Sequence, residues 1–391
     1  MGLKRILDIN LPKEQSLFLW GARKAGKSTF LKERFPDSLY IDFLQHSTFL
    51  EYSKNPSLLR ERIEVTGYAD IKAPIIIDEV QKVPQILDEV HWMIENFKGL
   101  SFIMCGSSIR KLKSIGSNLL GGRAWRQIFL PLCYPELEKL DLLHIFNNGL
   151  VPSHYLSQNY PKRLLEGYIV DYIIPEVQWE SRIRQLGSFN RFLEAMAFSN
   201  AELVNFSNIA RECHVSVKTV QGYTELLVDM LLGYLIYPYT KKTSRQVVVS
   251  MPRFYFFDIA LVNFLMKRKI EQLKGSDAGH CLEHYLFLEL LAYKHIKNTD
   301  YEIKYWRTKS GLEVDFIIDQ NPLVAIEVKI SGSINKSDLA GLISFSEELK
   351  PSRSLVVCLE KHKRIMTINN LKIEIWPIEE FLKQLWKGNI L

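Results

Sequence analysis

Residues 21–28 read G-A-R-K-A-G-K-S, and this segment constrains the fold of the chain more than any other. It matches the pattern G-x-x-x-x-G-K-[ST], a glycine-rich loop whose backbone N–H groups surround phosphates. An apolar, strand-like run at residues 16–20 precedes the loop, and helical sequence at residues 27–33 follows it. This strand–loop–helix order predicts an α/β domain with a parallel sheet and a nucleotide phosphate site.

The side chains of this loop predict ATP and Mg²⁺ as ligands. Lys27 supplies a positive charge to the β- and γ-phosphates, and Ser28 offers an oxygen to Mg²⁺. The helix that follows directs its N-terminal dipole at the same anion. The residues expected to bind the nucleotide are Gly21, Ala22, Arg23, Lys24, Ala25, Gly26, Lys27, Ser28 and Thr29.

Two acids follow a second buried strand at residues 75–77. We expect Asp78 to hold the Mg²⁺ and Glu79 to orient or activate the attacking water. A third apolar run, at residues 102–105, leads to Ser107 and Ser108. Either serine is suited to contact the γ-phosphate or the water, and either is equally suited to cap the next helix.

Arg123 lies in a glycine-anchored segment, G-G-R-A-W-R, which ends at Arg126. Arg123 is a candidate arginine finger that reaches the nucleotide of a neighbouring subunit, and this role would require a homo-oligomer. A solvated surface arginine is the alternative, because arginines are mostly exposed.

The length of 391 residues predicts two or three domains. Short apolar strands alternate with helical sequence as far as about residue 138, and helical periodicity dominates up to residue 235. Four further strands are expected after a helix around residues 281–295. We therefore divide the chain into a P-loop domain (1–145), a helical lid and winged-helix segment (146–250) and a C-terminal α/β domain (251–391).

Residues 206–213 and the sequence from residue 217 predict two helices joined by a short turn, with Ser216 as the N-cap of the second. This is a helix-turn-helix pattern, and its exposed face would include Lys218, Thr219 and Gln221. Such side chains are able to contact DNA or RNA. Because that face has few basic residues, a structural or protein-contact role is the alternative.

The C-terminal domain carries acids in an arrangement suited to metal-dependent cleavage of phosphodiesters. Asp315 and Glu327 lie on consecutive predicted strands, and Lys329 follows two residues after Glu327. The acids would bind Mg²⁺, and the lysine would stabilise charge. Glu283, or alternatively Glu289, on the preceding helix would complete the cluster. This pattern resembles the PD-(D/E)XK nucleases, and an inactive, binding-only fold is the alternative.

Other features of the chain limit its partners and its location. The net charge of +6 permits a nucleic-acid partner without requiring one. The five cysteines are scattered without a CxxC pair, which predicts reduced, buried thiols and argues against a zinc site. No signal peptide or membrane span is expected, so we predict a cytoplasmic protein without a membrane partner.

Motifs throughout the chain resemble the AAA+-type prokaryotic ATPases that carry a C-terminal domain of unknown function. The loop resembles the family pattern G-P-R-x-x-G-K-[ST]-T, with Ala22 in place of the usual proline. The other matching segments are residues 78–84 (D-E-V-Q-K-V-P), 106–108 (G-S-S), 122–123 (G-R), 130–132 (L-P-L), Glu136, 306–307 (W-R), 313–316 (E-V-D-F) and 327–329 (E-V-K). The resemblance implies an AAA+-like ATPase domain, a winged helix and a nuclease-like fold related to restriction endonucleases.

Two functions are consistent with these patterns. The first is an ATP-driven switch or motor whose C-terminal half acts on nucleic acid, with a nuclease as one form of this function. The second is a nucleotide-regulated signalling or scaffold protein whose C-terminal domains only bind partners. Convergence of Glu283, Asp315, Glu327 and Lys329 with room for a metal would favour the first.

Overall fold

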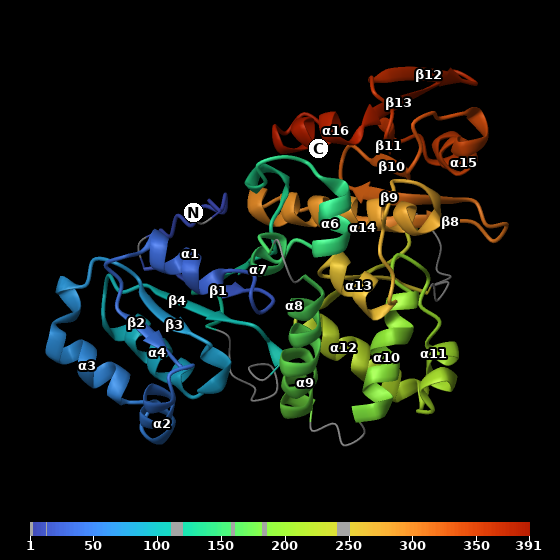
Figure 1. Ribbon diagram of the computed structural model, residues 1–391. Coiled ribbons are helices and arrows are strands. Elements are labelled where there is room, and N and C mark those ends of the chain that lie inside the picture. Colours follow the sequence, from blue (N-terminus) through green and yellow to red (C-terminus); the bar gives the residue numbers. More distant parts are fainter. Residues whose placement is uncertain (1–2, 13, 111–119, 158–160, 182–185, 241–250) are drawn as a thin grey trace.

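Figure 1 shows the protein as a computed structural model, coloured from a blue N-terminal sheet through green helices to a red C-terminal sheet. The structure describes residues 3–12, 14–110, 120–157, 161–181, 186–240 and 251–391. All five cysteines are buried and unpaired, as the sequence predicts. No helix within these described ranges is long and apolar enough to cross a lipid bilayer.

The N-terminal part is built on a five-stranded parallel sheet in the order β2-β3-β4-β1-β5. A parallel sheet brings the carboxyl ends of its strands to one edge. The P-loop, the Asp78–Glu79 pair and Ser107 follow β1, β3 and β4, so they meet at that edge. The strands are β1 (Ser16–Trp20), β2 (Tyr40–Asp42), β3 (Ile75–Asp78), β4 (Phe102–Gly106) and β5 (Ala124–Ile128).

Both faces of this sheet are covered, which explains why its central strands are almost entirely apolar. Phe18 and Trp20 of β1 point into a core shared with α2, α3 and α4. Leu17 and Leu19 point to the opposite face, which packs against α1 and the N-terminal segment. The helices are α1 (Lys27–Arg34), α2 (His46–Lys54), α3 (Leu58–Thr66) and α4 (Ile86–Asn96).

A helical middle part follows the sheet, and its helices α8 to α12 lie at the lower right in Figure 1. A short turn joins its helices α11 and α12 where the sequence predicts one, and the Ser216 hydroxyl accepts the N–H of Thr219 as the expected N-cap. An antiparallel pair of strands, β6 and β7, comes next. The elements are α6 (Leu142–Asn148), α7 (Pro152–Tyr155), α8 (Pro161–Gly167), the π-helix Tyr168–Ile173, α9 (Ile174–Ser181), α10 (Leu186–Phe198), α11 (Phe206–Cys213), α12 (Val217–Asp229), β6 (Gly233–Ile236), β7 (Arg253–Phe256) and α13 (Ile259–Leu265).

The C-terminal part is a mixed six-stranded sheet in the order β12-β13-β11-β10-β9-β8. Apolar residues of α14 and α16 pack on one face, and those of α15 pack on the other. The elements are α14 (Gly275–Lys297), β8 (Glu302–Arg307), β9 (Glu313–Asp319), β10 (Val324–Lys329), α15 (Ala340–Leu349), β11 (Arg353–Cys358), β12 (Arg364–Ile368), β13 (Leu371–Pro377) and α16 (Ile378–Trp386).

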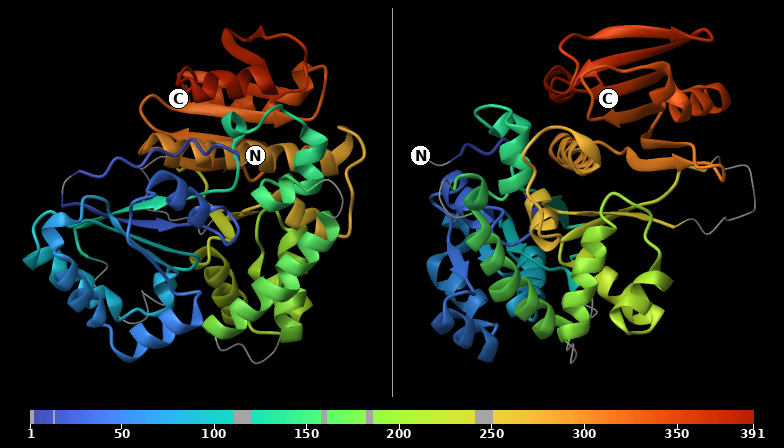
Figure 2. Two further views of the ribbon diagram at one scale, coloured as in Figure 1. Left: turned by 60° about the vertical axis from the view of Figure 1, so that its left-hand side comes forward. Right: turned by 45° about the vertical axis from the view of Figure 1, so that its right-hand side comes forward.

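The long helix α14 connects the parts. The two views of Figure 2 place it between the C-terminal sheet and the rest of the molecule. Its core also contains Leu132, Ile145 and Phe146 from the segment that follows the N-terminal sheet. On the edge strand β5, Gln127 Nε2 donates a hydrogen bond to the carbonyl oxygen of His295 at 2.7 Å. The C-terminal part therefore packs directly against the segment that follows the P-loop sheet.

Candidate functional site

The P-loop is held in shape by its two glycines. A Cβ atom on Gly21 would lie 2.2 Å from the carbonyl oxygen of Phe129, which is far too close for any side chain. Gly26 has a φ of 98°, a conformation that favours glycine, and α1 begins immediately after it. The loop therefore requires glycine at both positions for its path from β1 into the helix.

Lys27 lies inside this loop with only 5% of its surface exposed. Its Nζ donates to the carbonyl oxygens of Gly21 at 2.6 Å and Ala22 at 3.1 Å. Burial lowers the pKa of Lys27, while the Glu79 carboxylate acts in the opposite direction. The loop thus contains a poorly solvated cation whose hydrogen bonds go to backbone oxygens, and a phosphate can compete for them.

Ser28 and Asp78, the two residues that the sequence predicts to hold Mg²⁺, are in direct contact. The Ser28 hydroxyl donates to Asp78 Oδ2 at 2.6 Å. The Tyr40 hydroxyl donates to the same oxygen at 2.5 Å, and the Cys105 thiol donates to Oδ1. A hydroxyl and a carboxylate oxygen beside a phosphate site are ligands that Mg²⁺ prefers. Ser28 and Asp78 therefore fit Mg²⁺.

Glu79 follows Asp78 with its backbone in the left-handed region, at a φ of 55°. This conformation costs a residue other than glycine about 1–2 kcal/mol. Gln81 Nε2 donates to Glu79 Oε2 at 2.5 Å and lies 3.2 Å from Ser107 Oγ. The Ser107 hydroxyl is 3.4 Å from the same carboxylate oxygen.

The two serines that the sequence left as equal candidates differ in the structure. Ser107 lies beside Glu79, whereas Ser108 Oγ accepts the backbone N–H of Arg110 at 3.3 Å. Ser107 therefore belongs to the polar group around Glu79, and Ser108 supports the turn that follows β4.

The helical middle part contacts the P-loop at Arg23. The Tyr168 hydroxyl donates to the Arg23 carbonyl oxygen at 3.0 Å, and the Arg23 guanidinium lies 4.8 Å from the Tyr172 ring centroid. The buried Tyr172 hydroxyl has no hydrogen bond of good geometry among the described residues. Burial raises the pKa of Tyr172, and the nearby carboxylates of Glu176 and Glu79 raise it further. Both tyrosines lie on a π-helix, a rare element that is frequent at functional sites.

Arg5 supports the P-loop from the N-terminal segment. Its Nη1 donates to the Ala25 carbonyl oxygen at 2.7 Å, and its Nε donates to Glu136 Oε1 at 2.9 Å. Its guanidinium lies 4.1 Å from the centroid of the Phe129 ring. The chain before β1 and the segment after β5 are therefore both tied to the phosphate loop.

Arg123 lies at the amino-terminal ends of the sheet strands, whereas the P-loop lies at their carboxyl ends. It directly precedes β5, which pairs with β1 in parallel from Ser16 onward. The five residues of β1 separate the two ends by about 16 Å. The Arg123 side chain is 42% exposed, and it contacts Glu95 and His91 of α4. Arg123 is thus too far away to serve the nucleotide site of its own chain.

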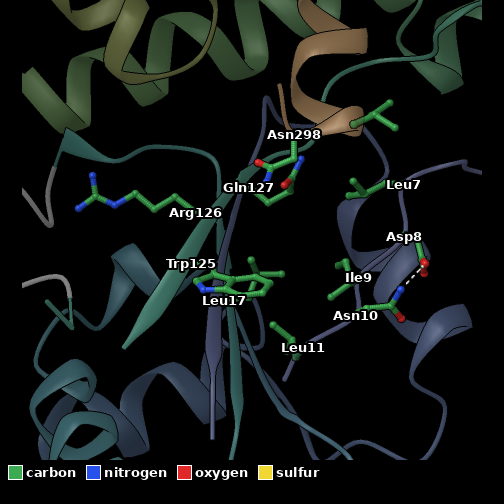
Figure 3. A pocket seen from close by; sticks show the side chains of 11 residues that line it. Leu7, Asp8, Ile9, Asn10, Leu11, Leu17, Trp125, Arg126, Gln127 and Asn298 are labelled. Atoms are coloured by element: carbon green, nitrogen blue, oxygen red, sulfur yellow. Dashed lines mark hydrogen bonds between the residues drawn. The ribbon is translucent and has the colours of Figure 1, made fainter. Parts of the chain in front are cut away.

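A pocket of about 430 Å³ lies beside the edge strand β5, between the N-terminal segment and the end of α14 (Figure 3). Leu7, Asn10, Trp125 and Asn298 are among its lining residues, and Asn10 donates to Asp8 there. None of the P-loop residues or the acids described above lines it. This pocket is therefore separate from the nucleotide site.

The four residues proposed for the C-terminal site come together in the structure. Glu327 on β10 follows the residue that pairs with Phe316, so it lies close to Asp315 on β9. Asp315 Oδ2 accepts the backbone N–H of Val328 at 2.8 Å, and Lys329 Nζ donates to Glu327 Oε1 at 2.6 Å. Burial raises the pKa of Glu283 to about 8, and Asp315 adds to this effect. Burial and Asp315 likewise raise the pKa of Glu327.

The alternative candidate, Glu289, lies elsewhere. It accepts the backbone N–H of Tyr134 at 2.8 Å and the indole N–H of Trp386 at 2.8 Å. Burial raises the pKa of Glu289 to about 7. Its position six residues after Glu283 on α14 directs it to the other side of the helix, where it anchors α16. Glu289 therefore does not belong to the acid group.

Arg253, which belongs to none of the sequence motifs, forms ion pairs with the C-terminal acids. Its side chain is 2% exposed and reaches Glu313 at 2.8 Å, Glu283 at 3.2 Å and Asp315 at 3.6 Å. The Tyr255 hydroxyl donates to Glu283 Oε1 at 2.6 Å. The only sequence signal was a single arginine at the start of an otherwise apolar strand, R-F-Y-F. Tyr40, Arg5 and Tyr172 likewise lie outside any pattern that the sequence offered.

Three family models match consecutive parts of the chain. Residues 13–138 match the AAA domain, residues 140–272 match a domain of unknown function (DUF8612), and residues 278–381 match another domain of unknown function (DUF4143). The first match agrees with the parallel sheet and the P-loop and identifies the N-terminal third as an ATPase-type domain. No curated protein matches the chain.

Proposed function

We propose that this protein binds ATP with Mg²⁺ and hydrolyses it to ADP and phosphate. The observation that carries the proposal is the Ser28–Asp78 contact of 2.6 Å beside Lys27, at the end of a glycine-shaped loop. The match of residues 13–138 to the AAA domain supports the same activity. Mg²⁺ held by Ser28 and Asp78 would neutralise charge on the β- and γ-phosphates.

The chain's own residues then have distinct roles. Lys27 exchanges its loop carbonyl partners for phosphate oxygens. Glu79, whose carboxylate accepts a hydrogen bond from Gln81, takes the proton of the attacking water as a general base. Ser107 and Gln81 hold the Glu79 carboxylate in place through the contacts described above. The two acids therefore divide metal binding from proton transfer.

Binding of Mg²⁺–ATP should stabilise the folded protein. At an ATP concentration about 100-fold above its dissociation constant, we expect about 2.7 kcal/mol of added stability. Thermal unfolding with Mg²⁺–ATP, with ATP plus EDTA and without nucleotide measures this effect, and phosphate release measures turnover. A melting temperature that Mg²⁺–ATP leaves unchanged, together with no phosphate release, would contradict the proposal.

We further propose that Arg123 acts on the nucleotide of a neighbouring copy of the chain, which makes the active form a homo-oligomer. Its partial exposure and its distance from the P-loop of its own chain support this role. The ATPase rate per chain should then rise with protein concentration. Arg123→Ala should remove that rise, because arginine fingers contribute about 10³–10⁵ to turnover.

Arg126→Ala is a suitable control, since Arg126 is exposed and lies on β5, three residues after Arg123. Its rate should rise with concentration like that of the wild type. A wild-type rate that is independent of concentration and unaffected by Arg123→Ala would make Arg123 an ordinary surface residue.

For the C-terminal two thirds, the buried Arg253 favours the second function, a nucleotide-regulated binding module. The acids are already paired with a cation of the protein itself, and this is unlike a prepared catalytic metal site. Binding of nucleic acid stays a prediction for this part of the chain. The exposed side of α12 carries Lys218 and Gln221 but also Glu225, so it offers little positive charge to a phosphate backbone.

A further inference from the structure

The acidic cluster formed by Glu283, Asp315 and Glu327 does not fit the divalent metal that its resemblance to nucleases implies. With Arg253 in place between the acids, no three acidic, histidine or cysteine side chains in the described part of the chain are arranged to hold a metal ion. We propose that the Arg253 guanidinium takes the place of that metal, so that the cluster binds no divalent cation while strand β7 stays in position.

The contacts of Arg253 support this assignment. Its planar guanidinium reaches two members of the acidic cluster, Glu283 at 3.2 Å and Asp315 at 3.6 Å, and it also binds Glu313 at 2.8 Å. The side chain is almost fully buried, and its guanidinium lies 5.1 Å from the centroid of the Tyr305 ring. An arginine in this geometry compensates several carboxylates at once, as a bound metal would.

One oxygen of each of the three acids accepts a hydrogen bond from a neighbouring group. Glu283 Oε1 accepts from both Arg253 and the Tyr255 hydroxyl, and Asp315 Oδ2 accepts the N–H of Val328. Glu327 Oε1 accepts from Lys329, while Glu327 Oε2 is buried without a hydrogen-bond partner among the described residues. Mg²⁺ takes about six oxygen ligands, and Arg253 already covers the shared side of Glu283 and Asp315. The unpartnered Glu327 Oε2 is therefore available to a divalent cation when the Arg253 side chain is removed or displaced.

The position of Arg253 is set by the middle part of the chain. Strand β7 pairs with β6, which closely follows α12. The backbone N–H groups of Ala201 and Val204 donate to the carbonyl oxygens of Phe254 and of Pro252, the residue before the strand. The acids on α14, β9 and β10 thus receive their compensating cation from strand β7 of the middle part. A displacement of β7 would uncover the acids, so metal binding at the acidic cluster depends on the contact between these two parts.

Mn²⁺ binding to the full chain without nucleotide tests the proposal. The wild type should show no Mn²⁺ site that Asp315→Asn removes. Arg253→Met, which keeps the apolar stem and removes the charge, should gain one Mn²⁺ per chain, and adding Asp315→Asn should abolish that gain. At a Mn²⁺ concentration about tenfold above the dissociation constant, the gain should raise the melting temperature by about 3 °C.

Two outcomes would overturn the proposal: an Asp315-dependent Mn²⁺ site in the wild type, or no gain in Arg253→Met. If circular dichroism shows that Arg253→Met does not fold, Arg253→Gln provides the same test, because its amide keeps hydrogen-bond donors without the charge. Arg268→Met is the matched control. Arg268 is also largely buried and pairs with Asp277 rather than with the acidic cluster, so this variant should gain no Mn²⁺ site.

Discussion

Replacing Lys27 with alanine should abolish measurable ATP hydrolysis, a loss of at least about 10³-fold. Lys27 is the cation held inside the P-loop, and its Nζ is bound only by loop carbonyl oxygens among the described residues. Without it, the phosphates lose their principal side-chain positive charge. Phosphate release under saturating Mg²⁺–ATP measures the effect.

The fold should tolerate this substitution. Burial already disfavours the charged form of Lys27, as the direction of its pKa change indicates, so alanine removes an unfavourably solvated charge. Lys54→Ala, which removes an exposed lysine at the end of α2, should keep wild-type turnover. Normal turnover in a folded Lys27→Ala protein would mean that the loop is not the ATP site.

The substitution Glu79→Gln should slow hydrolysis by about 10²–10⁴ while ATP still binds. Glutamine keeps the size of the side chain and can still contact Gln81 and Ser107, but it cannot accept the proton of water. Asp78 remains available to hold Mg²⁺. Single-turnover hydrolysis and the binding affinity for ATP, measured on the same preparation, separate the two effects.

The control for this variant is Glu138→Gln, an exposed acid outside the nucleotide site, which should leave both quantities unchanged. Asp78→Asn should differ from Glu79→Gln, because it weakens Mg²⁺-dependent binding as well as turnover. If Glu79→Gln turned over ATP normally while Asp78→Asn were inactive, the proposed division between the two acids would be wrong.

The sequence predicted the central strands of the N-terminal sheet because they are buried on both faces and therefore apolar throughout. Strand β5 escaped this signal since it lies at the edge, where Trp125 is 50% exposed and Arg126 faces solvent. An edge strand with a solvated side has no continuous apolar run. The same reason applies to β12 at the edge of the C-terminal sheet, where Ile365 is 59% exposed.

The nucleotide site was more predictable than its surroundings. The spacing of the P-loop fixes Lys27 and Ser28 on one turn, and the short parallel strand brings Asp78 to the same edge. Tyr40 reaches Asp78, and Arg253 reaches the C-terminal acids, from strands that contain no motif. Their positions depend on how strands and segments pack together, and a local pattern contains no information about such packing.

The environment of Asp78 makes stability and metal affinity compete with each other. The carboxylate accepts hydrogen bonds from Ser28, Tyr40, Cys105 and the backbone N–H of Glu79. Any cation that binds Asp78 must displace some of these donors, so each bond that rigidifies the end of β3 also opposes the metal. A substitution that strengthens these hydrogen bonds would therefore stabilise the sheet and lower the affinity of the proposed site for Mg²⁺. The Tyr40 hydroxyl is the donor whose removal would change this balance most directly.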